Sequence, residues 1–178
     1  MSARASRELT PVGDDDHVLG AAEPQLTLVE YGDFGCPHCF AAKLPIESLV
    51  RRFEGLRLVW RHFPDRELHP GADLAAELSE LAAARGNFWQ AHSLLLAGRD
   101  RFSTEGLLDA ASSLELGVSE AGSVLRAGTH RRRVEVDIAS GEAAGAHGTP
   151  TFFVDGQRLI GHWRQLAQIV PAAFEDTS

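Results

Sequence analysis

The sequence predicts an α/β fold in which a block of helices is inserted between two halves that contain strands. The runs at 26–31 and 56–63 are rich in apolar and β-branched residues, and the stretch between them has helical spacing, which makes a β–α–β unit. A strand pair at 151–160 and a closing helix follow a long alanine- and leucine-rich region. With 178 residues, we expect one domain with an insertion of this kind.

The first half is expected to begin with a short edge strand at Asp16–Gly20. The helix between the two long strands carries apolar residues at helical spacing from Phe40 to Phe53. Cys36 then falls at the N-cap and Pro37 at the first helical position, where the missing N–H of proline costs nothing. Pro45 is expected to kink this helix.

Five helices are expected between the two halves, because capping residues and glycines punctuate the apolar pattern. Their expected ranges are 70–85, 88–97, 104–116, 119–127 and 129–144, and the expected N-caps are Asn87, Ser103, Ser119 and Thr129. Large apolar residues of these helices are interpreted as core, namely Phe88, Trp89, Leu94 and Leu95.

The second half is predicted to be a hairpin followed by a helix. Asp155-Gly156 is a strong two-residue hairpin signal between the runs Thr151–Val154 and Gln157–Ile160. An amphipathic helix from Trp163 to Phe174 then closes the chain.

Composition and charge exclude several classes of function. The chain is 44% hydrophobic and 24% charged, which is typical of a globular protein, and its net charge of −8 argues against a nucleic-acid surface. The consecutive Arg131, Arg132 and Arg133 point to different faces of a helix, so we interpret them as a solvated face. No apolar run approaches ~18 residues, so no membrane span is predicted.

The amino terminus bears on localisation. Residues 1–16 contain no apolar stretch of roughly 7–15 residues that would serve as a signal peptide, so a cytoplasmic location is expected. A coding start further upstream would change this expectation to a periplasmic or secreted protein. Two cysteines in a reducing compartment are more often catalytic or metal-binding than structural.

Both cysteines of the chain lie in the motif Cys36-Pro37-His38-Cys39, where the predicted strand gives way to the helix. The partial positive charge of a helix N-terminus favours the thiolate at Cys36. Cys39 lies one turn further on and is close enough to form a disulfide with Cys36. This is the arrangement of a dithiol in which Cys36 attacks and Cys39 resolves a mixed disulfide.

Zinc binding is the alternative interpretation of two cysteines at this spacing, and it needs two further ligands. None of the eight histidines forms a short His-x3–5-His pair, and the nearest couple is His62 and His69. Pro37 and the strand–helix context also argue against zinc, so no metal is predicted. We find no phosphate-binding glycine loop and no nucleophile elbow, and no cofactor is expected.

These motifs resemble those of the DsbA family of thioredoxin-fold disulfide oxidoreductases. A CxxC motif alone is weak, but CxxC followed by a Gly-Thr-Pro-Thr segment that opens a hairpin is specific. The resemblance covers nearly everything from residue 16 to the end and implies a thioredoxin fold with an inserted helical block. The matching stretches are Asp16–Gly20, Thr27–Cys39, Arg61–Pro64, His69-Pro70 and Gly148–Val154.

The resemblance also implies a division of the chain. We expect a flexible lead-in at 1–15, a first half of the thioredoxin fold with the CxxC motif at 16–65, and a helical insertion at 66–128. The second half, with a cis-proline loop, is expected at 129–178.

A cis peptide bond at Thr149–Pro150, facing the dithiol, is a further implication of the resemblance. X-Pro bonds are the only ones that adopt cis at low cost, and the backbone before the proline is free to pair with an extended peptide. Thr149 and Pro150 are therefore expected to bind substrate; a plain trans turn proline is the alternative. In relatives with this Pro-His dipeptide the histidine, here His38, stabilises the thiolate and makes the disulfide a strong oxidant; otherwise His38 is only a surface residue.

Glu30 lies six residues before Cys36, where the thioredoxin fold places a buried acid behind the second cysteine. Strand alternation puts its side chain on the same, inward face as Leu26 and Leu28. A buried carboxylate with a raised pKa is able to carry the proton that Cys39 must lose. The alternative is an exposed acid at the end of a strand.

The sequence therefore predicts an enzyme, a DsbA-like protein disulfide oxidoreductase. It exchanges disulfides with protein substrates through Cys36 and Cys39, as an oxidant, and an unidentified partner recycles it. Phe34 and Trp163 either line the substrate site or belong to the core. The alternatives are a thioredoxin-fold module that only binds a peptide or metal, and a glutathione-dependent small-molecule enzyme, a class that generally lacks the second cysteine.

Overall fold

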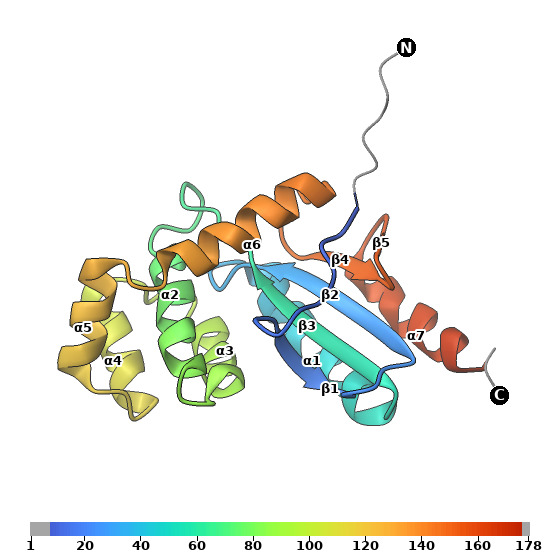
Figure 1. Cartoon of the computed structure of the whole chain (residues 1–178), viewed down its shortest axis with the longest axis horizontal. Helices are drawn as coiled ribbons and strands as arrows, with labels where there is room; N and C mark the ends of the chain where they lie inside the picture. The colour runs from blue at the N-terminus through green and yellow to red at the C-terminus, as the bar shows by residue number, and fades with distance from the viewer. Residues whose placement is uncertain (1–7, 176–178) are drawn as a thin grey trace, which may run out of the picture.

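The computed structural model describes residues 8–175, in which a mixed sheet of five strands forms the centre (Figure 1). Its strands follow the order β1-β3-β2-β4-β5. Strands β2 and β3 are parallel and the other neighbours are antiparallel, as a β–α–β unit followed by a hairpin requires. The α/β class and both strand-containing halves are confirmed. The strands are β1 His17–Gly20, β2 Leu26–Gly32, β3 Leu56–His62, β4 Thr151–Val154 and β5 Gln157–Arg158.

The helices divide into those that cover the sheet and those that gather beside it (Figure 1). The latter are α2 Ala72–Ala83, α3 Phe88–Ala97, α4 Thr104–Ser113 and α5 Val118–Ala127, whereas α1 Pro37–Arg52, α6 Arg131–Ala144 and α7 Leu166–Glu175 lie against the sheet. Helix α1 runs on through Pro45 to its end at Arg52. Within the described chain, no helix has the length and apolarity needed to cross a bilayer.

Alternation along β2 determines what each face of the sheet buries. Leu26 and Leu28 pack with side chains of α1 and α7. Val29 and Tyr31 point to the opposite face and pack with Phe153 and the end of α6. Since the period is two, Glu30 joins the α1 face, as predicted.

A third core lies between the sheet and the helical block, and both cysteines belong to it. Phe34 stacks on Trp60 with 5.2 Å between the ring centroids, and Phe88 and Leu95 of α3 are buried in the same cluster. Trp163 is buried in the core beneath α1 and α7. Phe34 and Trp163 are therefore core residues, and Trp163 also borders a hollow that includes Pro150.

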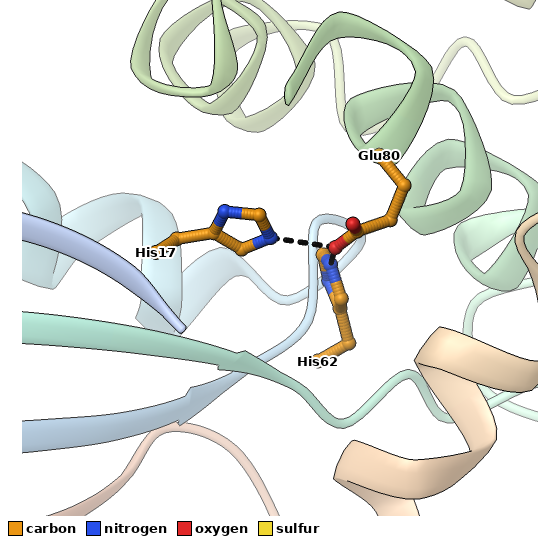
Figure 2. Close-up of side chains that lie close together, drawn as sticks. All are labelled: His17, His62 and Glu80. Carbon is orange, nitrogen blue, oxygen red and sulfur yellow. Dashed lines mark hydrogen bonds and ion pairs between the residues drawn. The ribbon is translucent and has the colours of Figure 1, made fainter. Parts of the chain in front are cut away.

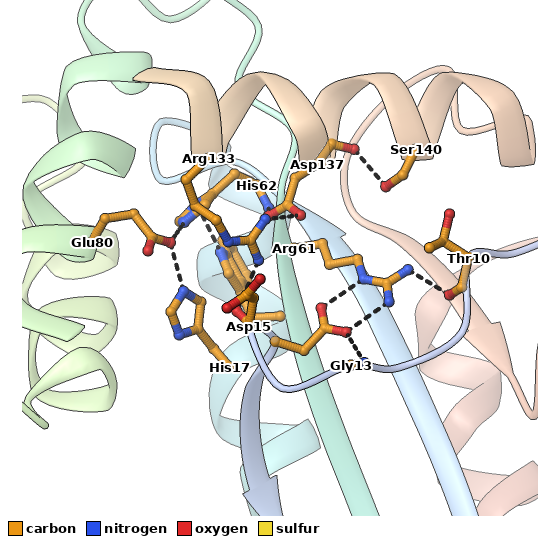
Figure 3. A network of polar contacts seen from close by, with 12 residues as sticks. Thr10, Gly13, Asp15, His17, Arg61, His62, Glu80, Arg133, Asp137 and Ser140 are labelled. Atoms are coloured by element: carbon orange, nitrogen blue, oxygen red, sulfur yellow. Dashed lines mark hydrogen bonds and ion pairs between the residues drawn. The ribbon is translucent and has the colours of Figure 1, made fainter. Parts of the chain in front are cut away.

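The amino-terminal segment is attached to the body of the protein from residue 8 on (Figure 3). The buried Arg61 guanidinium donates to the Thr10 and Pro11 carbonyls and pairs with Asp16 at 2.8 Å. Its Nη1 also donates to the Tyr31 hydroxyl. A flexible lead-in was expected over 1–15, but these contacts hold the segment at Thr10 and Pro11, and residues 1–7 lie outside the described chain.

The three consecutive arginines are not a purely solvated face. Arg133 pairs with Asp137 one turn along α6 and donates to the Asp15 carbonyl, and Arg131 lies 3.6 Å from the Glu77 carboxylate. Asp137 in turn accepts the His62 backbone N–H. Arg131 and Arg132 are exposed, as expected, whereas Arg133 is half-buried and reaches the Asp15 carbonyl (Figure 3).

The capping and turn residues predicted some ends of helices and strands correctly and others incorrectly. Ser103 caps α4 by accepting from the Gly106 N–H, as expected. Asn87 makes no side-chain cap bond, and Gly117 and His130 are the residues at the N-caps of α5 and α6 in place of Ser119 and Thr129. The Asp155-Gly156 turn has φ of 45° and 81° and forms the predicted hairpin, whose second strand ends at 158. The closing helix starts with a 3-10 turn at Trp163–Gln165.

Candidate redox site

Both cysteines sit at the amino-terminal end of α1, at the seam between the sheet and the helical block. Cys36 is the N-cap with extended backbone angles, and Pro37 is at the first helical position, as predicted. Cys39 follows within the first turn, and both residues are free thiols in this structure. Cys36 is 4% exposed and Cys39 is 1% exposed, and of the two only Cys36 lines the neighbouring cleft.

The surroundings of the two thiols push their pKa values apart. The Cys39 thiol donates a hydrogen bond to the Cys36 sulfur, and the backbone N–H groups of Cys39 and His38 also point at it. These donors outweigh burial and lower the pKa of Cys36 to about 5. Burial, together with the nearby Cys36 and Glu30, raises the pKa of Cys39 well above its ordinary value. At neutral pH these surroundings therefore favour a thiolate at Cys36 and a protonated thiol at Cys39.

Glu30 lies behind this pair with a buried carboxyl. It is 3% exposed, and its Oε1 has no hydrogen-bond partner among the described residues. Burial, reinforced by the charges of Cys36 and Glu47, raises the pKa of Glu30 to about 8. The carboxyl therefore exchanges its proton near neutral pH, close enough to Cys39 to influence that thiol electrostatically.

The loop before β4 faces the dithiol from the other half of the fold. The Thr149–Pro150 peptide bond is cis, and the Thr149 carbonyl oxygen lies 3.3 Å from the Cys36 sulfur, where it accepts from the thiol form. The CxxC motif and the loop before β4, which are 113 residues apart in sequence, are therefore in contact at the Cys36 sulfur.

His38 and Pro37 occupy exposed positions on the rim of the site. The structure brings the backbone N–H of His38 to the Cys36 sulfur. Its imidazole makes no hydrogen bond to Cys36 among the contacts found in residues 8–175. The lowered pKa of Cys36 thus comes from hydrogen bonds of the Cys39 thiol, Thr149 and the N–H groups at the helix start, and a contribution from the imidazole stays a prediction.

A cleft of about 600 Å³ opens beside Cys36. Its walls are the loop after β3, one side of α6 and the loop that precedes Pro150. The wall contains apolar side chains, including Phe63, Ile138 and Leu68, and Leu68 is 73% exposed. An extended chain that reaches Cys36 would therefore meet both apolar surface and the backbone of Thr149.

Asp33 is a site residue that the sequence analysis missed. Its side chain is completely buried, and its two oxygens accept from the backbone N–H groups of Gly35 and Asp65 and from Nδ1 of His69. The Asp33 carbonyl also accepts from the Cys36 N–H. An aspartate two residues before a glycine and three before the CxxC motif is typical of such a turn, which was the available signal.

A second polar cluster joins β1, β3 and α2 (Figure 2). Oε1 of Glu80 accepts from Nε2 of His17 at 2.6 Å and from Nε2 of His62 at 2.8 Å. Two histidines and a carboxylate suit a metal ion, but Trp60 donates its indole N–H to Nδ1 of His62. The proton of His62 must therefore be on Nε2, so that nitrogen has no lone pair for a metal. The cluster is a hydrogen-bonded bridge between strands and helical block.

Comparisons with known proteins agree with this architecture. A family model described as Thioredoxin (Thioredoxin_4) matches residues 13–170, so the chain belongs to this thioredoxin family. Na(+)/H(+) antiporter NhaA 1 of Salinispora arenicola is 38% identical over 172 residues, which is 95% of this chain and 26% of that protein. The chain thus spans about a quarter of the length of the curated relatives it matches.

Solved structures refine the class. A thioredoxin-like oxidoreductase from Silicibacter pomeroyi DSS-3 is 28% identical with a TM-score of 0.76, covering 92% of this chain and 94% of that one. BdbD from Bacillus subtilis, in its oxidised form, is 19% identical with a TM-score of 0.78 and coverages of 90% and 93%, which shows the fold. The chain is therefore a member of the thioredoxin family, and it shares the fold of these two structures along nearly its whole length.

Proposed function

We propose that the protein is a thiol–disulfide oxidoreductase that oxidises thiols of protein substrates through Cys36 and Cys39. The observation that carries the proposal is the opposite treatment of the two thiols, with the pKa of Cys36 lowered to about 5 and that of Cys39 raised. Such a dithiol needs one cysteine that an incoming thiolate reaches and that leaves easily, and a buried partner that is released in the first exchange and resolves the mixed disulfide in the reverse direction.

The chemistry proceeds in two exchanges. A substrate thiolate attacks Cys36 of the Cys36–Cys39 disulfide, the sulfur–sulfur bond breaks, and Cys39 leaves with the electron pair and takes a proton. The second thiolate of the same substrate then attacks the substrate sulfur of the mixed disulfide and releases Cys36 as a thiolate. The substrate gains a disulfide and the protein becomes the dithiol. Glu30 supplies and removes the proton of Cys39, since its carboxyl exchanges near neutral pH.

The expectation of protein substrates is supported by the cleft. It joins the reacting sulfur to apolar side chains and to backbone before the cis proline, which suits an extended peptide better than a small charged molecule. The predicted cytoplasmic location stays a prediction, as does the identity of the recycling partner.

The direction of thiol–disulfide exchange is linked to the relative stability of the reduced and oxidised protein. Stabilising the Cys36 thiolate stabilises the reduced protein and not the disulfide form. The reduced protein should therefore unfold at a higher urea concentration than the oxidised protein. A clearly more stable oxidised form would instead indicate a reductant.

Two cysteine variants test the reaction. Cys36→Ser should lose both insulin reduction and oxidation of a reduced peptide that contains two cysteines. Cys39→Ser should accumulate a mixed disulfide at Cys36, visible by mass spectrometry. Normal turnover by Cys39→Ser would contradict the assignment, and a wild-type protein that binds the peptide without exchange would support a binding module instead.

A further inference from the structure

His69 is held against the redox motif by contacts that span 36 residues of sequence. Its Nδ1 lies 2.7 Å from Oδ2 of the completely buried Asp33. Gly35, next to Cys36, leaves the room for this approach, because a Cβ there would lie 2.4 Å from the Cβ of His69. The imidazole is therefore packed on the residue that precedes the nucleophile.

The hydrogen bonds of Asp33 determine which nitrogen of His69 faces the cleft with a lone pair. Asp33 already accepts the N–H groups of Gly35 and Asp65, so it acts as an ionised acceptor and Nδ1 of His69 carries the proton. For Nε2 we find no partner within residues 8–175. The side chain is 24% exposed and lines the same cleft as Cys36.

We propose that His69, oriented by Asp33, accepts the proton of the substrate thiol that attacks Cys36. This inference rests on the proposed function and deepens it. In the oxidising direction the substrate S–H gives its proton to Nε2, and its sulfur electron pair forms the bond to Cys36. The Cys36–Cys39 bond breaks, its electron pair stays on the Cys39 sulfur, and a proton from Glu30 converts this sulfur to the thiol. The reverse exchange returns the His69 proton to the leaving substrate sulfur.

Other ionisable groups face this position from each neighbouring element. Asp33 is buried behind His69, and the ionisable residues that line the cleft with His69 are Cys36, His38, Asp65, Arg66, Glu142 and His147. Two of them are histidines, His38 and His147, so a pH profile alone does not identify the base. The test therefore needs a variant that removes the titratable nitrogen of His69 and keeps its contact with Asp33.

His69→Asn is that variant, because an asparagine amide donates from nearly the position of Nδ1 and has no basic nitrogen. The oxidised wild-type and variant proteins are mixed with a cysteine peptide whose thiol has a pKa of about 8.5, and reduction of the Cys36–Cys39 disulfide is followed by quenching and mass spectrometry. At pH 6.5 only about 1% of such a thiol is ionised, so a base is able to accelerate its attack by at most about 100-fold. His130→Asn, at the N-cap of α6 and outside the cleft, is the matched control.

We expect His69→Asn to react between about 10- and 100-fold more slowly than wild type at pH 6.5, with the difference disappearing above pH 9 where the peptide thiol is ionised. The aromatic thiol 2-nitro-5-thiobenzoate, already ionised at pH 6.5, should react equally with both proteins. His130→Asn should follow wild type with either thiol.

Equal slowing with both thiols at every pH would mean that His69 only maintains the loop, and no slowing would mean that it has no part in the reaction; either result overturns the proposal. If His69→Asn does not fold, His69→Gln replaces it in the same two-thiol comparison. A wild-type protein that reacts with neither thiol would contradict the proposed function itself, so the two failures are distinguishable.

Discussion

Replacing Glu30 by glutamine should change the pH dependence of stability by an amount that follows from its environment. The carboxyl has an ordinary pKa of 4.5, and burial raises the pKa to about 8 in the native protein. Between these values the native state binds more protons than the unfolded state, so stability falls as pH rises. At pH 7, 2.5 units above the unfolded value, the cost is about 3 kcal/mol, since each unit corresponds to about 1.36 kcal/mol.

Glu30→Gln removes this titration. A glutamine amide leaves its own unpaired polar atoms, but that cost is the same at every pH. The stability difference between Glu30→Gln and reduced wild type should therefore shift in favour of the variant by about 3 kcal/mol from pH 4.5 to 7, and by little more above pH 8.

Urea unfolding of the reduced proteins at intervals between pH 4.5 and 9 measures the effect. Glu54→Gln, at an exposed position, is the control and should follow wild type throughout. A stability difference between Glu30→Gln and wild type that does not change with pH would refute the raised pKa and, with it, the role of Glu30 in proton transfer to Cys39.

Three further predictions concern the parts of the site separately. The thiolate absorbance of the reduced protein should titrate with a midpoint near pH 5 and disappear in Cys36→Ser, whereas a midpoint near the ordinary value of 9.0 would contradict the electrostatic account. Burial alone would raise the pKa of Glu80, but the hydrogen bonds from His17 and His62 outweigh burial and hold this pKa below its ordinary value of 4.5. Glu80→Gln should therefore lower the free energy of unfolding in urea by about 2–4 kcal/mol at pH 7, and this loss should shrink below about pH 4. An undiminished loss at pH 3 would show that the charge of Glu80 is not responsible. Gly35→Ala places a Cβ 2.4 Å from His69 and should lower the unfolding free energy by about 1–3 kcal/mol, while Gly148→Ala, with open space around it, should not; equal stability of the two variants would refute the close contact.

Features that depend on neighbouring residues could be predicted from the sequence. Pro37 sets the helix start, and with it the N-cap position of Cys36, because a proline without an N–H fits the first turn. The two-residue period of a strand places Glu30 on the inward face. The Asp155-Gly156 pair determines its hairpin through two positive φ angles.

Features that depend on contacts between residues far apart in the sequence could not be predicted from the sequence. The bond from His69 to Asp33 joins residues 36 apart, and the bridge from His17 to Glu80 joins residues 63 apart. Polar residues at such separations carry no periodic signal, so His69 was noticed only within a family motif. The attachment of the amino-terminal segment was not predicted for the same reason. Arg61 holds the Thr10 and Pro11 carbonyls through tertiary contacts, which the polar composition of the segment does not reveal.

The reversible exchange of the Cys36–Cys39 pair is the central claim, and equilibration with glutathione tests it most directly. The protein is incubated in a series of reduced and oxidised glutathione mixtures, quenched with an alkylating reagent and weighed by mass spectrometry. The account predicts a single two-electron transition between a doubly alkylated dithiol and an unalkylated disulfide, at a potential more oxidising than the thioredoxin value of about −270 mV. Two thiols that stay alkylated in every mixture, or a glutathione adduct at Cys36 that never resolves, would contradict it.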